Sequence, residues 1–188
     1  MYGDELRGEF PPLLHSLYCR VYSCERQYTS FGGYDDRASA DVLTHAADLG
    51  VNFWDTSDIY GPHTNEQLIG KWFKDTGRRK EIFLASKFGN LRDAEGKPTV
   101  RGDREYVKEA CLASLQRLGV DQIDLYYQHR VDPKVPIEET VKAMVELKEE
   151  GKIRYLGLSE CSAKTLRRAC KVCSNARGRW LRTRDAEC

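Results

Sequence analysis

The feature that most constrains the fold is an alternation, from about Asp35 to Val172, between short apolar runs and longer segments with helical periodicity. The apolar runs are rich in β-branched and aromatic residues, and they fall at residues 51–55, 81–87, 122–129 and 155–158. Strands that alternate with helices are joined by crossovers, and crossovers make neighbouring strands parallel. The sequence therefore predicts an α/β fold built on a parallel sheet.

Local signals place helices between these runs. The side chains expected to cap helices are Asp35 or Asp36, Thr64 in a capping-box pattern with Gln67, Asp103, and Ser162. The first helix is predicted to bury one apolar stripe, made of Ala38, Val42, Leu43, Ala46 and Leu49. The polar segment at residues 89–102, GNLRDAEGKPTVRG, is expected to be a loop, because its glycines and proline oppose regular structure.

Such a repeat builds either a closed barrel or an open doubly wound sheet. The open sheet that binds dinucleotides carries a GxGxxG turn between a strand and a helix, and this sequence has none. Its absence favours a (β/α) barrel type, with LLHSLYCRVY as a further candidate strand. We expect an atypical N-terminal segment at 1–34, a barrel domain at 35–172 and an irregular basic tail at 173–188.

The balance of charge argues against some classes of partner. The 188 residues include 30 Lys and Arg against 29 Asp and Glu, a net charge of +1, so no overall field attracts nucleic acid or a membrane surface. No segment approaches the roughly 20 apolar residues that span a bilayer. The first residues also lack the basic opening and unbroken apolar stretch of a secretory signal. We expect a cytoplasmic protein without a membrane partner.

The cysteines give no sign of a metal site. The 7 cysteines show no spacing typical of a secreted disulfide framework, so reduced thiols are expected. Cys170 and Cys173 form a CxxC, but no second pair of ligands follows to complete a zinc site.

Four residues with complementary chemistry close or follow the predicted strands. Asp55, Lys87 and His129 stand at strand ends, and Tyr60 follows the first strand closely. Taken singly, they could be a turn-capping aspartate, a half-buried aromatic, a snorkelling lysine and a loop histidine. Because the carboxyl ends of parallel strands meet on one face, their common placement instead favours one shared site.

This set of side chains suits the reduction of a carbonyl group. Hydride delivered to the carbon leaves negative charge on the oxygen, where a proton donor must meet it. Tyr60 is the candidate donor, and Lys87 is expected to stabilise the phenolate because a free tyrosine has a pKa of about 10. Asp55 is expected to keep Lys87 charged, and His129 to hydrogen-bond the carbonyl oxygen or share in proton transfer.

Longer motifs around these residues resemble the aldo-keto reductase family. They are GVNFWDTSDIYG, NEQLIGKWF, IFLASKFG, SLQRLGVDQIDLYYQHRVDP, PIEETVKAMVELKEEGKIRYLGLSE and SAKTLRRA. The order and spacing of these motifs are highly specific, and they are most similar to a fungal and plant branch of NADP-dependent reductases. The resemblance implies that residues 35–172 are a partial aldo-keto reductase barrel domain, an incomplete (β/α)8 TIM-type barrel with about five βα units. It also implies NADPH as cofactor and a small-molecule carbonyl as substrate.

The resemblance also assigns residues to roles. It places the family's catalytic aspartate, tyrosine, lysine and histidine on Asp55, Tyr60, Lys87 and His129, the same set that the strand ends pick out. Cofactor contacts are implied for three residues: Asp55, Ser159, which matches the position that holds the nicotinamide carboxamide, and Glu160, where many relatives carry asparagine.

The two ends depart from the family pattern. Residues 1–34 lack its glycine-containing first strand, and residues 173–188 stand where relatives continue into a strand whose tyrosine stacks on the nicotinamide. An altered reading frame, alternative splicing or gene decay would produce such ends. A second reading is therefore a catalytically inactive remnant or regulatory relative that lacks the cofactor loops. Binding of nucleic acid by the arginine-rich tail is less favoured, because such tails also arise without function.

Overall fold

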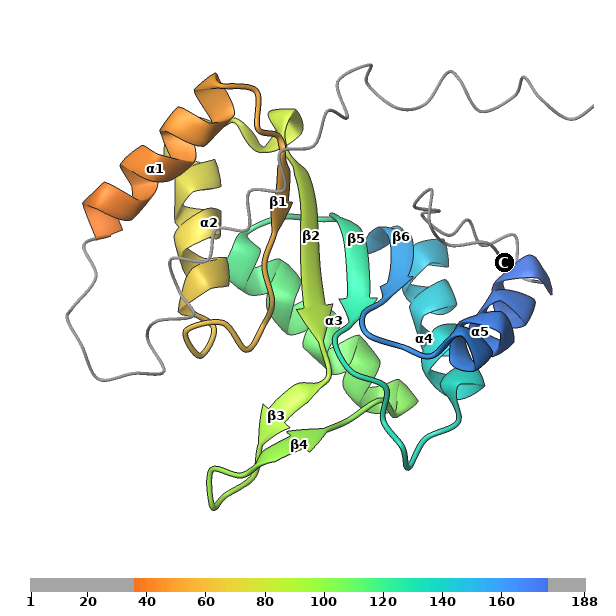
Figure 1. Cartoon of the computed structure of the whole chain (residues 1–188). Helices are drawn as coiled ribbons and strands as arrows, with labels where there is room; N and C mark the ends of the chain where they lie inside the picture. Colours follow the sequence, from red (N-terminus) through yellow and green to blue (C-terminus); the bar gives the residue numbers. More distant parts are fainter. Residues whose placement is uncertain (1–35, 176–188) are drawn as a thin grey trace, which may run out of the picture.

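The computed structural model describes residues 36–175, which form a parallel sheet and the helices that cover it (Figure 1). Strands β1 (Phe53–Asp55), β2 (Phe83–Phe88), β5 (Ile123–Gln128) and β6 (Ile153–Leu158) lie in that order, and each neighbouring pair is parallel. Each strand lies beside its predecessor, as in the wall of a barrel. The predicted partial (β/α)8 barrel is confirmed. These residues hold four βα units, and the strand expected in LLHSLYCRVY lies outside them.

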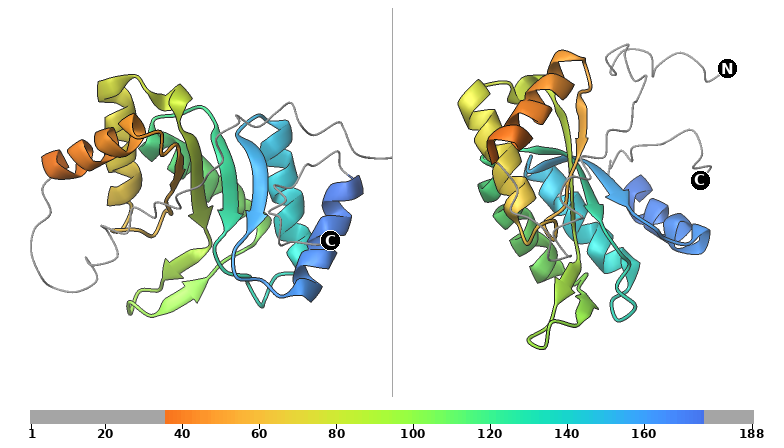
Figure 2. Two further views of the ribbon diagram at one scale, coloured as in Figure 1. Left: turned by 45° about the horizontal axis from the view of Figure 1, so that its top comes forward. Right: turned by 60° about the vertical axis from the view of Figure 1, so that its left-hand side comes forward.

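The helices follow one another along the sheet in chain order. They are α1 (Asp36–Asp48), α2 (Thr64–Thr76), α3 (Arg104–Leu118), α4 (Ile137–Glu149) and α5 (Ala163–Asn175). Each helix packs against the next, and α3 and α4 also pack on strands β2 and β6 (Figure 2). A short 3₁₀ helix at Arg79–Glu81 leads into β2. This order lines up the loops that follow the strands at one end of the sheet.

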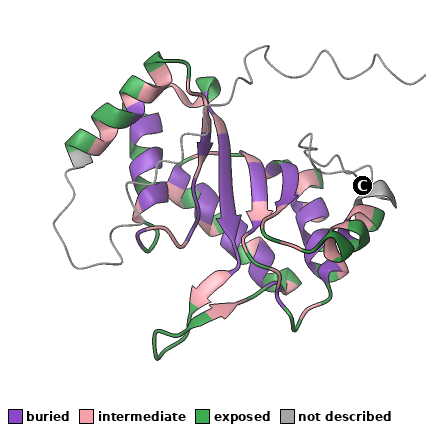
Figure 3. Cartoon of the chain, viewed as in Figure 1, coloured by how far each residue is buried: buried purple, intermediate pink, exposed green. Residues whose placement is uncertain are grey.

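The main core lies between the sheet and the helices, where buried residues concentrate (purple in Figure 3). Alternate strand residues point into it, as the period of two requires. Trp54 of β1 is almost fully buried, and its indole lies 4.7 Å from the Trp72 ring and 6.0 Å from the Phe73 ring, centroid to centroid. Leu84, Tyr126 and Leu156 extend this core across the other three strands. The strands are therefore held from the helix side.

The opposite, inner face of the sheet carries a second cluster, made of Ala85, Leu125 and Tyr155 with Phe53, Phe83 and Tyr127 packed against it. Gly157 lets Tyr127 lie across this face, because a Cβ on Gly157 would stand 2.3 Å from the Tyr127 ring. By the same alternation, Asp55 and Lys87 belong to this inner face. The inner face is thus apolar along the sheet and polar at the carboxyl ends of the strands.

The polar segment at 89–102 is not a loop throughout, so that prediction was wrong. Strands β3 (Asn90–Arg92) and β4 (Pro98–Val100) pair as an antiparallel hairpin. Its turn is built by Asp93, whose carboxylate accepts from the backbone N–H groups of Glu95 and Lys97, and by Gly96 at φ +79°. Proline is tolerated at the first position of an edge strand. Turn chemistry therefore outweighed the opposing signals.

Helix α1 does not bury the whole predicted stripe. Leu43 is buried, whereas Ala38, Val42 and Leu49 are exposed, the last two at 56% and 68%. The helix packs mainly on α2 rather than on the sheet, so only one edge of its apolar side finds a partner there.

The predicted caps had mixed outcomes. Asp103 caps α3 by accepting from the Tyr106 N–H at 3.1 Å, and Ser162 accepts from the Thr165 N–H at 3.1 Å, so both predictions are confirmed. The prediction that Thr64 forms a capping box with Gln67 was wrong. His63 precedes α2 in a left-handed conformation, and the Thr64 hydroxyl donates to the Gly61 carbonyl instead.

Residues 36–175 contain neither a membrane-spanning helix nor a cluster of metal-binding side chains. No helix there is long and apolar enough to cross a bilayer. No group of three or more His, Cys, Asp or Glu residues in the same part could hold a metal ion. The segments predicted at 1–34 and 173–188 lie almost entirely outside the described residues.

Candidate active site

The structure brings Asp55, Tyr60, Lys87 and His129 together at the carboxyl ends of neighbouring strands. Asp55 ends β1, Lys87 lies near the end of β2, and His129 directly follows β5. The His129 N–H donates to the Phe88 carbonyl, which fixes the end of β5 against β2. Tyr60 lies in the β1–α2 loop, whose Thr56 and Asp58 N–H groups donate to carbonyls of β2. Parallel pairing thus gathers residues far apart in the sequence.

Lys87 and Asp55 form a buried ion pair. The Lys87 Nζ lies 2.6 Å from Asp55 Oδ2 and 3.0 Å from the Thr56 carbonyl oxygen, and only 9% and 12% of the two side chains are exposed. Burial disfavours a lone charge, but a carboxylate and a carbonyl at these distances stabilise the ammonium form. The other oxygen, Asp55 Oδ1, is buried without a hydrogen-bond partner among the described residues.

The rings of Tyr60 and His129 complete the cluster. The Lys87 Nζ lies 5.2 Å from the centroid of the Tyr60 ring. The Tyr60 and His129 rings meet edge to face, with centroids 5.9 Å apart and planes at 85°. A phenol, an ammonium group and an imidazole therefore share one partly buried site.

His129 is neutral at physiological pH. Its pKa is lowered to about 4 because burial disfavours the imidazolium, and the positive charges of Lys87 and Arg130 act in the same direction. A neutral imidazole carries a hydrogen on only one ring nitrogen. Its Nδ1 lies 3.2 Å from Ser57 Oγ.

The two residues implied as cofactor contacts follow β6. The Ser159 N–H donates to the Gln128 carbonyl at 2.9 Å, which places Ser159 beside the end of β5. Glu160 has a left-handed backbone, at φ 49°, and its exposed carboxylate pairs with Arg130. Ser159 thus adjoins the cluster, and the Glu160 side chain is engaged by the loop after β5.

The model of the aldo/keto reductase family matches residues 24–179. The chain belongs to this family. It is 51% identical over 152 residues to the aldo-keto reductase yakc, with NADP(+) in its name, of Schizosaccharomyces pombe, which covers 80% of this chain and 45% of that protein. It is 59% identical over 135 residues to the aldo-keto reductase str7 of Strobilurus tenacellus. That match covers 72% of this chain and 38% of str7.

A solved aldo-keto reductase has the same fold over the part that it shares with this chain. The holo form of an enzyme from Bacillus halodurans superposes with a TM-score of 0.66 at 40% identity, covering 74% of this chain and 46% of that one. This member of the family therefore spans less than half the length of the relatives compared here.

Sequence reasoning missed Ser57 and Asp58 in this aldo/keto reductase chain. Both are buried, and the Ser57 hydroxyl contacts both Asp58 and His129. Burial and, second to it, the negative charge of Glu66 raise the pKa of Asp58 to about 7. The available signal was their position in WDTSDIYG, between a strand end and the candidate proton donor, but nothing local marked Asp58 as buried.

Proposed function

We propose that this chain carries the catalytic centre of an NADPH-dependent reductase that converts aldehyde or ketone carbonyls to alcohols, with Tyr60 as proton donor. The observation that carries the proposal is the buried Lys87–Asp55 pair beside the Tyr60 ring, with Nζ and Oδ2 2.6 Å apart and Nζ 5.2 Å from the ring centroid. Family membership supports the same chemistry.

Each side chain has a distinct role in this proposal. Tyr60 gives its proton to the carbonyl oxygen as negative charge develops there, and the Lys87 ammonium stabilises the phenolate that remains. Asp55 holds the ammonium in place. His129 is neutral, so it orients the substrate as a hydrogen-bonding group and not as a cation. General acid catalysis of this kind contributes about 10² to 10⁴ in rate.

The residues present suit the nicotinamide end of the cofactor. Asp55 Oδ1 is a buried acceptor without a partner among residues 36–175, and Ser159 adjoins the cluster from β6. A hydroxyl or amide group of a bound nucleotide could donate a hydrogen bond to Asp55 Oδ1, and an amide group could form hydrogen bonds with Ser159. The cofactor would supply the hydride. NADPH is the form we propose because the relative yakc has NADP(+) in its name.

A second candidate function rests on the length of the match. The chain spans 45% and 38% of its two curated relatives, and β1 and β6 each pair with a single strand within the described residues. An aldo/keto reductase fold that holds the cluster but binds no cofactor would be a catalytically inactive or regulatory protein.

Cofactor titration of the purified chain separates the two functions. NADPH fluorescence is measured first, and oxidation of NADPH by an aromatic aldehyde second, in the wild type and in Tyr60→Phe. We expect Tyr60→Phe to keep NADPH binding and to lose at least about 100-fold in rate. Tyr155→Phe, on the same inner face, is the matched control and is expected to keep its rate. Absence of NADPH binding would favour the inactive or regulatory function.

A further inference from the structure

The Ser57 hydroxyl lies among three possible acceptors. Its Oγ is 3.2 Å from Asp58 Oδ1, 3.3 Å from the Lys87 carbonyl oxygen and 3.2 Å from His129 Nδ1. Ser57 is fully buried, so water does not compete for these contacts. The hydroxyl therefore connects a carboxyl group outside the proposed catalytic set to the imidazole inside it.

A hydroxyl has one hydrogen to donate, so Ser57 must choose among these acceptors. The Lys87 carbonyl already accepts from the Asp58 N–H at 3.1 Å, which leaves Asp58 Oδ1 and His129 Nδ1 as the main competitors. An ionised carboxylate forms a stronger hydrogen bond than a neutral imidazole nitrogen does. While Asp58 is ionised, the hydroxyl donates to it, and a Ser57 lone pair is left to accept from His129 Nδ1–H.

Protonation of Asp58 reverses this arrangement. A carboxylic acid is itself a donor, so it can donate to Ser57 Oγ, and the hydroxyl hydrogen then points to His129 Nδ1. A neutral imidazole that accepts at Nδ1 carries its hydrogen on Nε2. His129 can then donate from Nε2 to a carbonyl oxygen, which it cannot do in the other tautomer.

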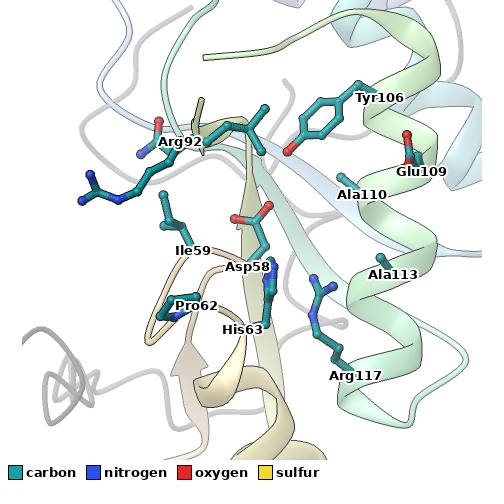
Figure 4. Close-up of a pocket in the computed structure, with 12 residues that line it drawn as sticks. Asp58, Ile59, Pro62, His63, Arg92, Tyr106, Glu109, Ala110, Ala113 and Arg117 are labelled. Carbon is teal, nitrogen blue, oxygen red and sulfur yellow. The ribbon is translucent and has the colours of Figure 1, made fainter. Parts of the chain in front are cut away.

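Asp58 lines a cavity of about 340 Å³ on the side away from the four proposed catalytic residues. Figure 4 shows its carboxyl group pointing into the space between Ile59 and Tyr106, with Arg117 below. None of the four proposed catalytic residues lines this cavity. Protons can therefore reach Asp58 from a side that the substrate does not occupy.

Charged and titratable groups face Asp58 from every element that packs on it. They are His63 from its own loop, Glu66 from α2, Arg92 from β3, Tyr106, Glu109 and Arg117 from α3, and Tyr126 from β5. The Arg117 Nε is held by Glu66 Oε2 at 2.7 Å, and Glu66 also accepts from Ser86 at 2.6 Å. Arg117 and Glu66 therefore largely neutralise each other. Burial and the negative charge of Glu66 raise the pKa of Asp58 to about 7, and no cation among residues 36–175 forms an ion pair with it.

We propose that Ser57 is a positioning residue that sets the tautomer of His129, and that the ionisation state of Asp58 decides which tautomer it sets. The proposal rests on the proposed function only in its consequence for catalysis. At pH values where Asp58 is protonated, His129 carries its hydrogen on Nε2 and is ready to donate to a carbonyl. At higher pH the hydrogen moves to Nδ1.

The test is a nitrogen-15 NMR spectrum of the imidazole side chains of the full chain, which distinguishes protonated from bare ring nitrogens. Spectra are taken from about pH 6 to about pH 8, a range in which His129 stays neutral. We expect the Nδ1–H form of wild-type His129 to grow from the minor to the major species. His129→Gln assigns the signal.

Three variants separate a relay from a merely structural role. Asp58→Asn cannot ionise and its amide can donate to Ser57, so we expect His129 to keep its hydrogen on Nε2 across the range. Ser57→Ala removes the relay, so the tautomer ratio should lose its pH dependence. Thr140→Val removes another buried hydroxyl, one that donates to the Gly102 carbonyl, and should behave as the wild type.

The outcomes are decisive for Ser57 whether or not the chain reduces carbonyls. A wild-type His129 signal that does not change from about pH 6 to about pH 8, or a Ser57→Ala signal that still changes, overturns the proposal. If Ser57→Ala fails to fold, the wild type and Asp58→Asn alone decide it. Failure of the proposed function would appear instead as missing NADPH oxidation, with the NMR result unaffected.

Discussion

Two aspartates three positions apart, Asp55 at the end of β1 and Asp58 in the loop that follows it, have different surroundings. Asp55 faces the inner side of the sheet and lies 2.6 Å from a buried ammonium group. Asp58 faces the helices, and the guanidinium group of Arg117 beside it is shared with Glu66. Both carboxyl groups are largely buried, so the difference is the partner and not the depth. Asp55 is held in an ion pair with a cation of its own, whereas Asp58 is buried without one among the described residues, and burial raises its pKa.

Removing the dedicated cation should have the largest effect. Lys87→Met leaves Asp55 buried without its counter-ion, and breaking a buried pair in this way costs about 3 kcal/mol or more of unfolding free energy. Urea denaturation measures the loss. The double variant Asp55→Asn/Lys87→Met should recover part of it, because no unpaired charge remains. A single variant as stable as the wild type would mean that the pair is not buried as described.

Removing the titrating carboxyl group should have the opposite sign. The pKa of Asp58 rises from 3.8 to about 7 in the folded protein, so the folded state binds the proton more tightly than the unfolded state does. The unfolding free energy therefore falls as pH rises from about 4 to about 7, by at most about 4 kcal/mol, and the full penalty is present above about pH 7.

Asp58→Asn avoids this penalty, so it should be more stable than the wild type at about pH 8, with the difference fading toward about pH 4. Urea denaturation at both pH values checks it, and Asp121→Asn, at an exposed position, is the control. The lowered pKa of His129 affects both proteins alike and cancels in the difference. Equal differences at the two pH values would contradict the ionisation assigned to Asp58.

The smallest effect is expected from an exposed pair with the same geometry. Lys71 Nζ and Asp75 Oδ2 also lie 2.6 Å apart, but 66% and 54% of these side chains are exposed. Lys71→Met should change the unfolding free energy by less than about 0.5 kcal/mol, because water solvates either charge when the other is absent. A loss as large as that of Lys87→Met would show that distance, and not burial, sets the strength of these pairs.

The sequence was sufficient for the order of the strands in the parallel sheet and for the common position of the four proposed catalytic residues near the carboxyl ends of those strands. Alternation of strands and helices set the order of the elements, and the strand ends identified where Asp55, Lys87 and His129 lie. The burial of Asp58 could not be predicted in this way. It depends on α3, a helix that comes after β2, β3 and β4 in the chain. The exposure of Val42 likewise depends on tertiary packing, because α1 packs mainly on α2.

Two other predictions were wrong because a local hydrogen bond competed with the pattern in the sequence. Thr64 has the sequence of a capping box, but its hydroxyl donates to the Gly61 carbonyl in the turn before α2. Gly96 is typical of irregular structure, but here it builds the turn of the hairpin together with Asp93. In both places a local hydrogen bond decided the backbone, and only the folded geometry shows which one forms.

The order of the strands in the sheet has a consequence for how the chain folds during synthesis. Each strand of the four-stranded sheet docks against the strand of that sheet that precedes it in the chain, so no contact has to close a loop longer than the segment between two consecutive strands of the sheet. Folding can then proceed from the ribosome in steps, one unit after another. Lys87 meets Asp55 as soon as β2 docks, and His129 joins them only after the hairpin and α3 have been made.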